Sequence, residues 1–210
     1  MCDLDLRRKC GYKPRSRAEP PRPSAHGGAR SFSAFMGLPE EGRTAACEMD
    51  TVTGLKSDRR CLLTLYSRPF RLQLALLMPG KTAAATESAL DMLERAAPKA
   101  FRRLFSLLLT DNGAEFARHA ELRERLGMAT YFADPYPSYR RGGNENCNGA
   151  IHRHLPKRTR IEPSMADEIQ AIVDEINNRP MRVLGYRTPA EAFANELPSL
   201  TKQQGRCTSK

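Results

Sequence analysis

The chain of 210 residues has no apolar run close to the length that a membrane-spanning helix needs, which is about 18 residues. Its N-terminus, MCDLDLRRK, also lacks the hydrophobic stretch of a secretory signal peptide. Both absences favour a protein that stays in the cytoplasm and has no membrane partner.

Cysteine is sparse and widely scattered. The six cysteines form no CxxC pair, and no two histidines stand at the spacing of zinc ligands. These absences argue against a zinc-binding module and indicate reduced thiols, as is usual in the cytosol. The cysteines are Cys2, Cys10, Cys47, Cys61, Cys147 and Cys207.

Basic residues are in excess. Lysine and arginine number 34 against 24 aspartates and glutamates, which gives a formal net charge of +10. Such a charge favours a polyanionic partner, and nucleic acid first, because phosphate binding is electrostatic. Between residues 134 and 160 the basic side chains are interleaved with Tyr136 and Tyr139, and they are Arg140, Arg141, Arg153, Lys157, Arg158 and Arg160.

The composition divides the chain into three parts. Residues 1–44 are rich in proline and glycine and carry a basic cluster, which predicts a linker or basic arm with one short helix near residues 31–36. Residues 45–197 have the apolar content of one packed domain. Residues 198–210 are predicted to be a disordered tail.

Within this central part, alternating apolar patterns predict an α/β domain. Helix starts are expected at Thr82, at the cap residue Asn144, near Ser164 and at Thr188. The predicted strands are 47–52, 61–66, 70–78, 107–110 and 128–132, and the predicted helices are 82–96, 117–126, 145 to before Pro156, 165–178 and from Pro189 onward.

Three acidic residues occupy unusual positions on these elements. Asp50 lies inside a strand, Asp111 directly follows the buried run 107–110, and Glu145 opens a helix. Glu48 would share the strand face of Asp50 and is the local rival for the first acid. Two carboxylates about 4 Å apart repel by roughly 4 kcal/mol at an effective dielectric of 20, so convergence would require protonation or a cation. Oxygen ligands favour Mg²⁺ or Mn²⁺.

Four segments of the chain resemble the integrase-core transposases of bacterial insertion sequences, specifically the insertion-sequence thirty family. They occur in the same order and spacing over about residues 45–197. The segments are EMDTVTG, LTDNGAEF, YFADPYPSYRRGGNENCNGAIHRHLPKRT and NNRPMRVLGYRTPAEAF.

The resemblance implies a ribonuclease-H-like fold of the retroviral integrase type, with a mixed five-stranded sheet flanked by helices. It implies that Asp50, Asp111 and Glu145 form the DDE triad, which holds two Mg²⁺ or Mn²⁺ ions for DNA cleavage and strand transfer. The expected partner is double-stranded DNA, both transposon ends and target, bound by a homo-oligomer at the bacterial nucleoid. The expected DNA-binding residues are Asn112, Arg140, Arg141, Asn144, Asn148, His152, Arg153, Lys157 and Arg158.

The helix that follows Glu145 is predicted to have two faces. Asn148, Gly149 and His152 would share the side of Glu145 and remain free for metal and DNA, whereas the other side would pack. The packing residues would be Cys147, Ile151 and Leu155. The preceding loop, 134–143, could form a mobile flap over the site.

Some features depart from the family pattern. His152 stands where relatives usually have arginine, and a neutral imidazole binds phosphate less strongly. Cys47 replaces a common tryptophan, and Arg158 replaces a common glycine. Relatives also carry a helix-turn-helix region upstream, for which this chain has no room, so it looks like a truncated transposase.

Two alternative functions remain open from the sequence. One is a catalytically impaired transposase remnant that binds DNA, or a full-length transposase, without turnover. The other is a nuclease of the same fold that acts on RNA hybrids.

Overall fold

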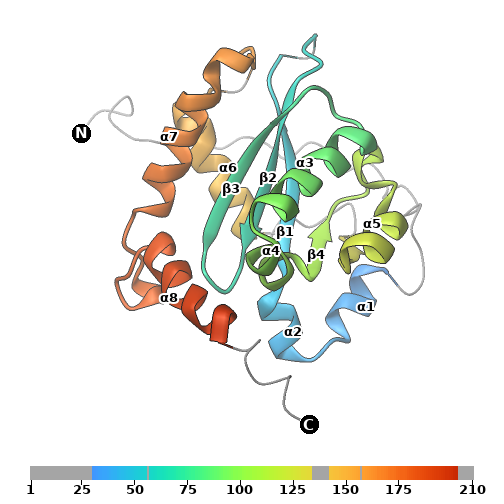
Figure 1. Cartoon of the computed structure of the whole chain (residues 1–210). Coiled ribbons are helices and arrows are strands. Elements are labelled where there is room, and N and C mark those ends of the chain that lie inside the picture. Colours follow the sequence, from blue (N-terminus) through green and yellow to red (C-terminus); the bar gives the residue numbers. More distant parts are fainter. Residues whose placement is uncertain (1–29, 56, 134–141, 157, 203–210) are drawn as a thin grey trace, which may run out of the picture.

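The structure is a computed structural model that describes residues 30–55, 57–133, 142–156 and 158–202. The side chains of residues 142, 144, 145, 147 and 197–202 are outside this description. The strands form one mixed sheet in the order β3-β2-β1-β4-β5 (Figure 1). They are β1 (Cys47–Thr53), β2 (Cys61–Ser67), β3 (Leu72–Met78), β4 (Leu107–Thr110) and β5 (Ala129–Phe132).

The predicted mixed five-stranded sheet is confirmed. β1, β2 and β3 pair antiparallel, whereas β4 runs parallel to β1 and β5 runs parallel to β4. β3 begins two residues later than predicted, because the preceding turn contains Arg71 in a left-handed conformation with φ 56°. The aliphatic runs therefore give the strands correctly, and turn geometry sets the difference.

Helices cover both faces of the sheet. One face, which includes Met49 and Leu63, packs against α3 (Ala83–Ala96), α4 (Pro98–Phe105), α5 (His119–Leu126) and α8 (Pro189–Lys202). The other face, which includes Val52 and Leu62, packs against α6 (Gly142–His154) and α7 (Ala166–Asn177). In Figure 1, α3 and α4 lie in front of the strands and α6 lies behind them. No helix in the described part of the chain is both long and apolar enough to cross a bilayer.

Two short helices precede the sheet, α1 (Phe32–Met36) and α2 (Glu40–Ala45). The predicted helix near residues 31–36 is confirmed, and Ser31 Oγ accepts a hydrogen bond from Ala34 N at 3.3 Å as its N-cap. Phe32 and Phe35 are buried in a cluster with Leu109. The boundary predicted at residue 44 stays a prediction, and residues 1–29 lie outside the described ranges.

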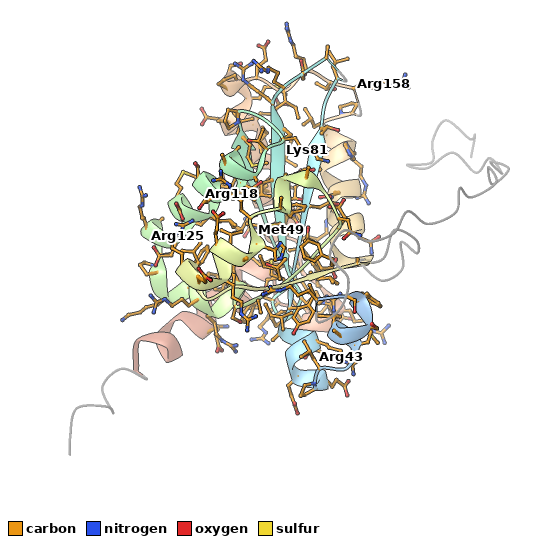
Figure 2. All side chains as sticks on the ribbon, turned by 90° about the vertical axis from the view of Figure 1, so that its right-hand side faces the viewer. Arg43, Met49, Lys81, Arg118, Arg125 and Arg158 are labelled. Atoms are coloured by element: carbon orange, nitrogen blue, oxygen red, sulfur yellow. The ribbon has the colours of Figure 1, made fainter. Side chains whose placement is uncertain are left out.

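Ion pairs connect α5 to α3 across the surface of the first face. Arg118 Nη1 lies 3.0 Å from Glu87 Oε2, and Arg125 Nη2 lies 2.8 Å from Glu87 Oε1. Arg125 also pairs with Asp91. Figure 2 shows Arg118 and Arg125 on the same side of the molecule. These contacts hold α5, and with it the loop that follows β4, against the body of the domain.

Helix starts are predicted less well than strands. α4 was not predicted, because Pro98 indicated only the end of the preceding helix, whereas Pro98 occupies the first turn of a new one. α6 begins at Gly142, so the prediction that Asn144 is its N-cap is wrong. Ser164 lies in a 3₁₀ turn, Pro163–Met165, and α7 then starts at Ala166 without a side-chain cap.

Threonine side chains cap two helices, and the cap predicted at Thr188 is confirmed. Thr82 Oγ1 accepts from Ala85 N at 3.2 Å at the start of α3. Thr188 Oγ1 accepts from Glu191 N at 3.1 Å, and Glu191 Oε2 accepts from Thr188 N at 2.8 Å, which is a reciprocal capping box.

The outer strand β3 is covered at its start by the end of α7. Asn177 Oδ1 accepts from Gln73 N at 2.9 Å, and Asn177 Nδ2 donates to Gln73 O at 2.7 Å. The side-chain amide thereby makes the two hydrogen bonds that a neighbouring strand would make. Asn177 is 7% exposed and Gln73 is fully buried, so water does not reach these groups. Asn177 therefore closes part of a sheet edge that would otherwise be open.

Replacing this amide should destabilise the domain. Asn177→Ala leaves the buried N–H and C=O of Gln73 without these partners, and each such group costs about 1–3 kcal/mol. We expect the free energy of unfolding to fall by about 2–4 kcal/mol in urea denaturation. The control is Asn178→Ala at the exposed neighbouring position, for which the unfolding midpoint should change little. Equal midpoints for both variants would contradict this role of Asn177.

Candidate active site

Asp50 and Asp111 come from neighbouring parallel strands. The pairing of β1 with β4 includes Cys47 with Leu108 and Glu48 with Leu109. Continuing this register by two residues on each chain places Asp50 beside Asp111. Since neighbouring strands lie about 4.8 Å apart, the two side chains leave the sheet side by side, at the edge to which the carboxyl ends of β1 and β4 point. Both residues are partly exposed, so the edge is open to solvent.

The Asp50 carboxylate connects β1 to α6. Its Oδ1 accepts from Thr51 N at 2.8 Å, and its Oδ2 accepts from Asn148 Nδ2 at 3.3 Å. Asn148 Oδ1 is buried and has no hydrogen-bond partner among the described residues. An unsatisfied acceptor next to a carboxylate is a place where a cation or its water ligands would fit.

The Asp-Asn-Gly triplet forms a turn that holds Asp111 at the strand end. Asp111 Oδ1 accepts from Gly113 N at 3.0 Å, so the side chain folds over its own backbone. Asn112 Nδ2 donates to Ala133 O at 3.4 Å, which connects the turn to the end of β5. Asn112 thus has a structural contact, and its predicted contact with DNA stays a prediction.

Helix α6 carries Glu145 along the face of the sheet that bears Asp50. Ile151 and Leu155 are buried beside Val52, which confirms the predicted packing side of the helix. A Cβ on Gly143 would lie 2.1 Å from the Tyr66 ring, so the first turn rests directly on the sheet. Glu145 stands three residues before Asn148 and therefore on the same side of α6. The Glu145 side chain itself is outside the described residues.

Glu48, the rival for the first acid, has a different partner. It is 2% exposed, and its Oε1 lies 2.8 Å from Arg68 Nε. Arg68 also donates to Arg43 O at 3.1 Å, which joins this ion pair to α2. Glu48 therefore belongs to a buried structural pair at the start of β1, and Asp50 is the better candidate for a metal ligand.

The predicted phosphate contacts are spread over several positions. His152 is half-buried, and its Nδ1 lies 3.2 Å from Leu155 O. Arg153 and Arg158 are exposed. Figure 2 shows Arg158 at the end of the molecule opposite Arg43, away from α1 and α2. Arg140, Arg141 and Lys157 lie outside the described residues, as does most of the proposed flap, 134–141, and the side chain of Asn144.

A further acid close to the site was not identified from the sequence as functional. Glu115, in the 3₁₀ turn Ala114–Phe116, is 2% exposed. Its Oε1 accepts from Thr51 Oγ1 at 2.9 Å and lies 3.1 Å from Lys81 Nζ. The only sequence signal was its place in the segment LTDNGAEF, because its partners are distant in the chain.

The two described cysteines are buried free thiols, and neither is a reactive group. Burial raises the pKa of Cys61 to about 11, Lys81 opposes this shift, and Glu115 adds to it. Burial, with a further contribution from Glu48, raises the pKa of Cys47 well above its usual range. Both thiols stay protonated at neutral pH, so they offer no thiolate to a metal or a substrate.

The donor set at the sheet edge suits a hard cation. Asp50, Asp111 and the amide of Asn148 supply oxygen atoms, which are the preferred ligands of Mg²⁺ and Mn²⁺. Among the described side chains, which do not include that of Glu145, no group of three or more acidic, histidine or cysteine residues is arranged to hold a metal.

The chain matches no protein-family model. It does match curated transposases of insertion sequences. It is 36% identical over 149 residues to the transposase for insertion sequence element IS4351 of Bacteroides fragilis, covering 70% of this chain and 43% of that protein. It is 34% identical over 144 residues to the transposase InsI for element IS30C of Escherichia coli strain K12, covering 69% of this chain and 36% of that protein. It is 36% identical over 137 residues to the transposase for element IS1086 of Cupriavidus metallidurans, covering 65% of this chain and 40% of that protein.

A solved structure supports the fold independently. The chain is similar to the catalytic core domain of BIV integrase with a TM-score of 0.52 at 18% identity, covering 76% of this chain and 99% of that domain. This similarity confirms the predicted ribonuclease-H-like fold of the integrase type. The chain spans less than half the length of the curated transposases named above. Over the region that they share, the chain is a homologue of insertion-sequence transposases, among them the transposase of element IS30C.

Proposed function

We propose that this chain is the metal-dependent catalytic part of a DNA transposase. It would cleave DNA at the ends of an insertion sequence and join the freed strand to target DNA. The observation that best supports the proposal is the position of Asp50 on β1 and of Asp111 directly after the adjacent parallel strand β4, with α6 attached to Asp50 through Asn148. The similarity to transposases and to an integrase core agrees with it.

In this proposal the carboxylates of Asp50, Asp111 and Glu145 would hold two Mg²⁺ or Mn²⁺ ions. When bound, the ions activate the attacking oxygen and neutralise charge on the leaving oxygen. The amide of Asn148 orients Asp50 through Oδ2, and the Gly113 N–H orients Asp111 through Oδ1. Because these hydrogen bonds fix the carboxylates before DNA binds, little reorganisation is needed at the time of reaction.

Basic and amide side chains around α6 would hold the DNA backbone. Arg153 and Arg158 are exposed and can reach phosphates directly, and Asn148 and His152 lie along the same helix as Glu145. The net charge of +10 supports binding of double-stranded DNA, both transposon ends and target. A homo-oligomer on DNA would bring two ends together. The remaining proposed contacts are Asn112, Arg140, Arg141, Asn144 and Lys157.

Removing the charge of one proposed ligand should abolish catalysis. For Asp50→Asn, Asp111→Asn and Glu145→Gln we expect the rate of strand transfer to fall by at least about 100-fold. Loss of a residue that only orients a metal ligand already lowers metal affinity or activity by up to about 100-fold. The assay uses Mn²⁺ and a labelled duplex that carries the inverted repeats flanking the coding sequence.

The matched control is Asp167→Asn, an exposed acid in the first turn of α7, which should keep wild-type activity. Equal strand transfer by wild type and Asp111→Asn would refute the assignment of Asp111. A wild-type chain that binds DNA but neither binds Mn²⁺ in calorimetry nor transfers strands would instead be the impaired remnant. Cleavage confined to RNA hybrids would identify the nuclease alternative.

His152→Arg should strengthen DNA binding. The imidazole already contacts Leu155 O through Nδ1, and arginine would add a permanent charge at a site exposed enough to reach a phosphate. One added phosphate contact should steepen the slope of log K against log salt by about 0.9. The slope can be measured by fluorescence anisotropy between 50 and 200 mM salt, which is roughly the range where such effects are large. An unchanged slope would show that this position does not face DNA.

A further inference from the structure

Glu115 is a buried carboxylate in the loop that follows Asp111. It makes two polar contacts through Oε1, one with Thr51 Oγ1 at 2.9 Å and one with Lys81 Nζ at 3.1 Å. Burial of a carboxylate is costly unless it is paired, and here a cation and a hydroxyl provide the pairing. An apolar side chain would fill this space without the cost of burying a charge, so the carboxylate is expected to have a specific role.

The contact with Thr51 joins the two chain segments that carry the acids. Thr51 directly follows Asp50 on β1, and Glu115 lies four residues after Asp111. The backbone pairing of β1 with β4 ends at Glu48 and Leu109, two residues before the acids. Beyond that point, the hydrogen bond between Thr51 and Glu115 continues the connection between strand and loop.

Gly113 lies between this carboxylate and Asp111. A Cβ on Gly113 would be 2.4 Å from Glu115 Oε2 and 2.7 Å from Glu115 Oε1. The backbone of Gly113 has φ −64° and ψ 143°, which any residue can adopt, so the close carboxylate is what requires glycine. Gly113 N in turn donates to Asp111 Oδ1 at 3.0 Å. The Glu115 carboxylate therefore lies directly against Gly113, whose N–H holds the Asp111 carboxylate.

We infer that Glu115 is a positioning residue that sets the separation of the Asp50 and Asp111 carboxylates. This inference rests on the proposed function, because the separation matters for two groups that share metal ions. Glu115 itself is not a ligand, since Oε1 is occupied by Thr51 and Lys81 and Oε2 lies against Gly113. Its effect is exerted on the two acids through the hydrogen bonds named above.

The test measures Mn²⁺ affinity by isothermal titration calorimetry on the DNA-free protein. Thr51→Val removes only the hydroxyl donor at nearly constant volume, and Glu115→Ala removes the carboxylate. We expect each to weaken Mn²⁺ binding by about 10-fold or more, as is usual for groups that orient metal ligands. Glu115→Gln keeps an oxygen that can accept from Thr51 and should recover part of the affinity. Strand transfer by Thr51→Val and Glu115→Ala should likewise need a higher Mn²⁺ concentration for its half-maximal rate. The rate should return to that of the wild type at saturating Mn²⁺.

Double variants separate positioning from general damage. The loss of Mn²⁺ affinity in the double variant Thr51→Val/Glu115→Ala should not exceed the loss in Glu115→Ala alone, because both substitutions break the same hydrogen bond. Gly113→Ala alone should weaken Mn²⁺ binding, whereas adding it to Glu115→Ala should cost nothing more, since the carboxylate it meets is gone. The control is Glu121→Ala, an exposed acid on α5, which should bind Mn²⁺ like the wild type.

Wild-type Mn²⁺ affinity in both Thr51→Val and Glu115→Ala, or fully additive losses, would overturn the inference and leave the proposed function intact. If thermal denaturation shows that Glu115→Ala is not folded, the Mn²⁺ affinity of Thr51→Val alone tests the inference. A wild type that binds no Mn²⁺ would overturn the proposed function, and this inference with it.

Discussion

The parallel pairing of β1 with β4 is the constraint on which the proposed site depends. It brings Asp50 and Asp111, which are far apart in sequence, to one sheet edge. Two such charges about 4 Å apart repel by roughly 4 kcal/mol at an effective dielectric of 20, so the fold must hold them together. The ladder ends two residues earlier, and hydrogen bonds donated by Asn148 Nδ2, Gly113 N and Thr51 Oγ1 fix the last part of each segment.

Apolar packing supplies the framework for these bonds. Ile151 and Leu155 are buried in one cluster with Val52, which holds α6 against the sheet face that also bears Asp50. Asn148, three residues before Ile151, reaches Asp50 on that same face. On the other face, α3, α4, α5 and α8 cover the sheet. The same architecture occurs in an integrase core with only 18% identity, which indicates that the fold tolerates wide sequence change. The residues of the proposed site that the structure describes come from the ends of β1 and β4 and from α6.

Much of this fold was predictable because strands in a buried sheet are short aliphatic runs, such as 107–110. The candidate acids were predictable because each lies in a motif with defined neighbours. The starts of α4 and α6 were not, since Pro98 can end one helix or begin another, and Asn144 can cap a helix or lie inside it. The contacts of Glu115 and Asn177 were hidden because their partners are about 64 and 104 residues away, and no local pattern encodes such pairs.

The central claim is that Asp50 and Asp111 share metal ions. Anomalous diffraction from crystals grown with Mn²⁺ would test it most directly. We predict a manganese peak between the two carboxylates, with oxygen distances of about 2.0–2.3 Å. Ordered carboxylates without a peak between them, at a Mn²⁺ concentration that supports strand transfer in solution, would contradict the claim.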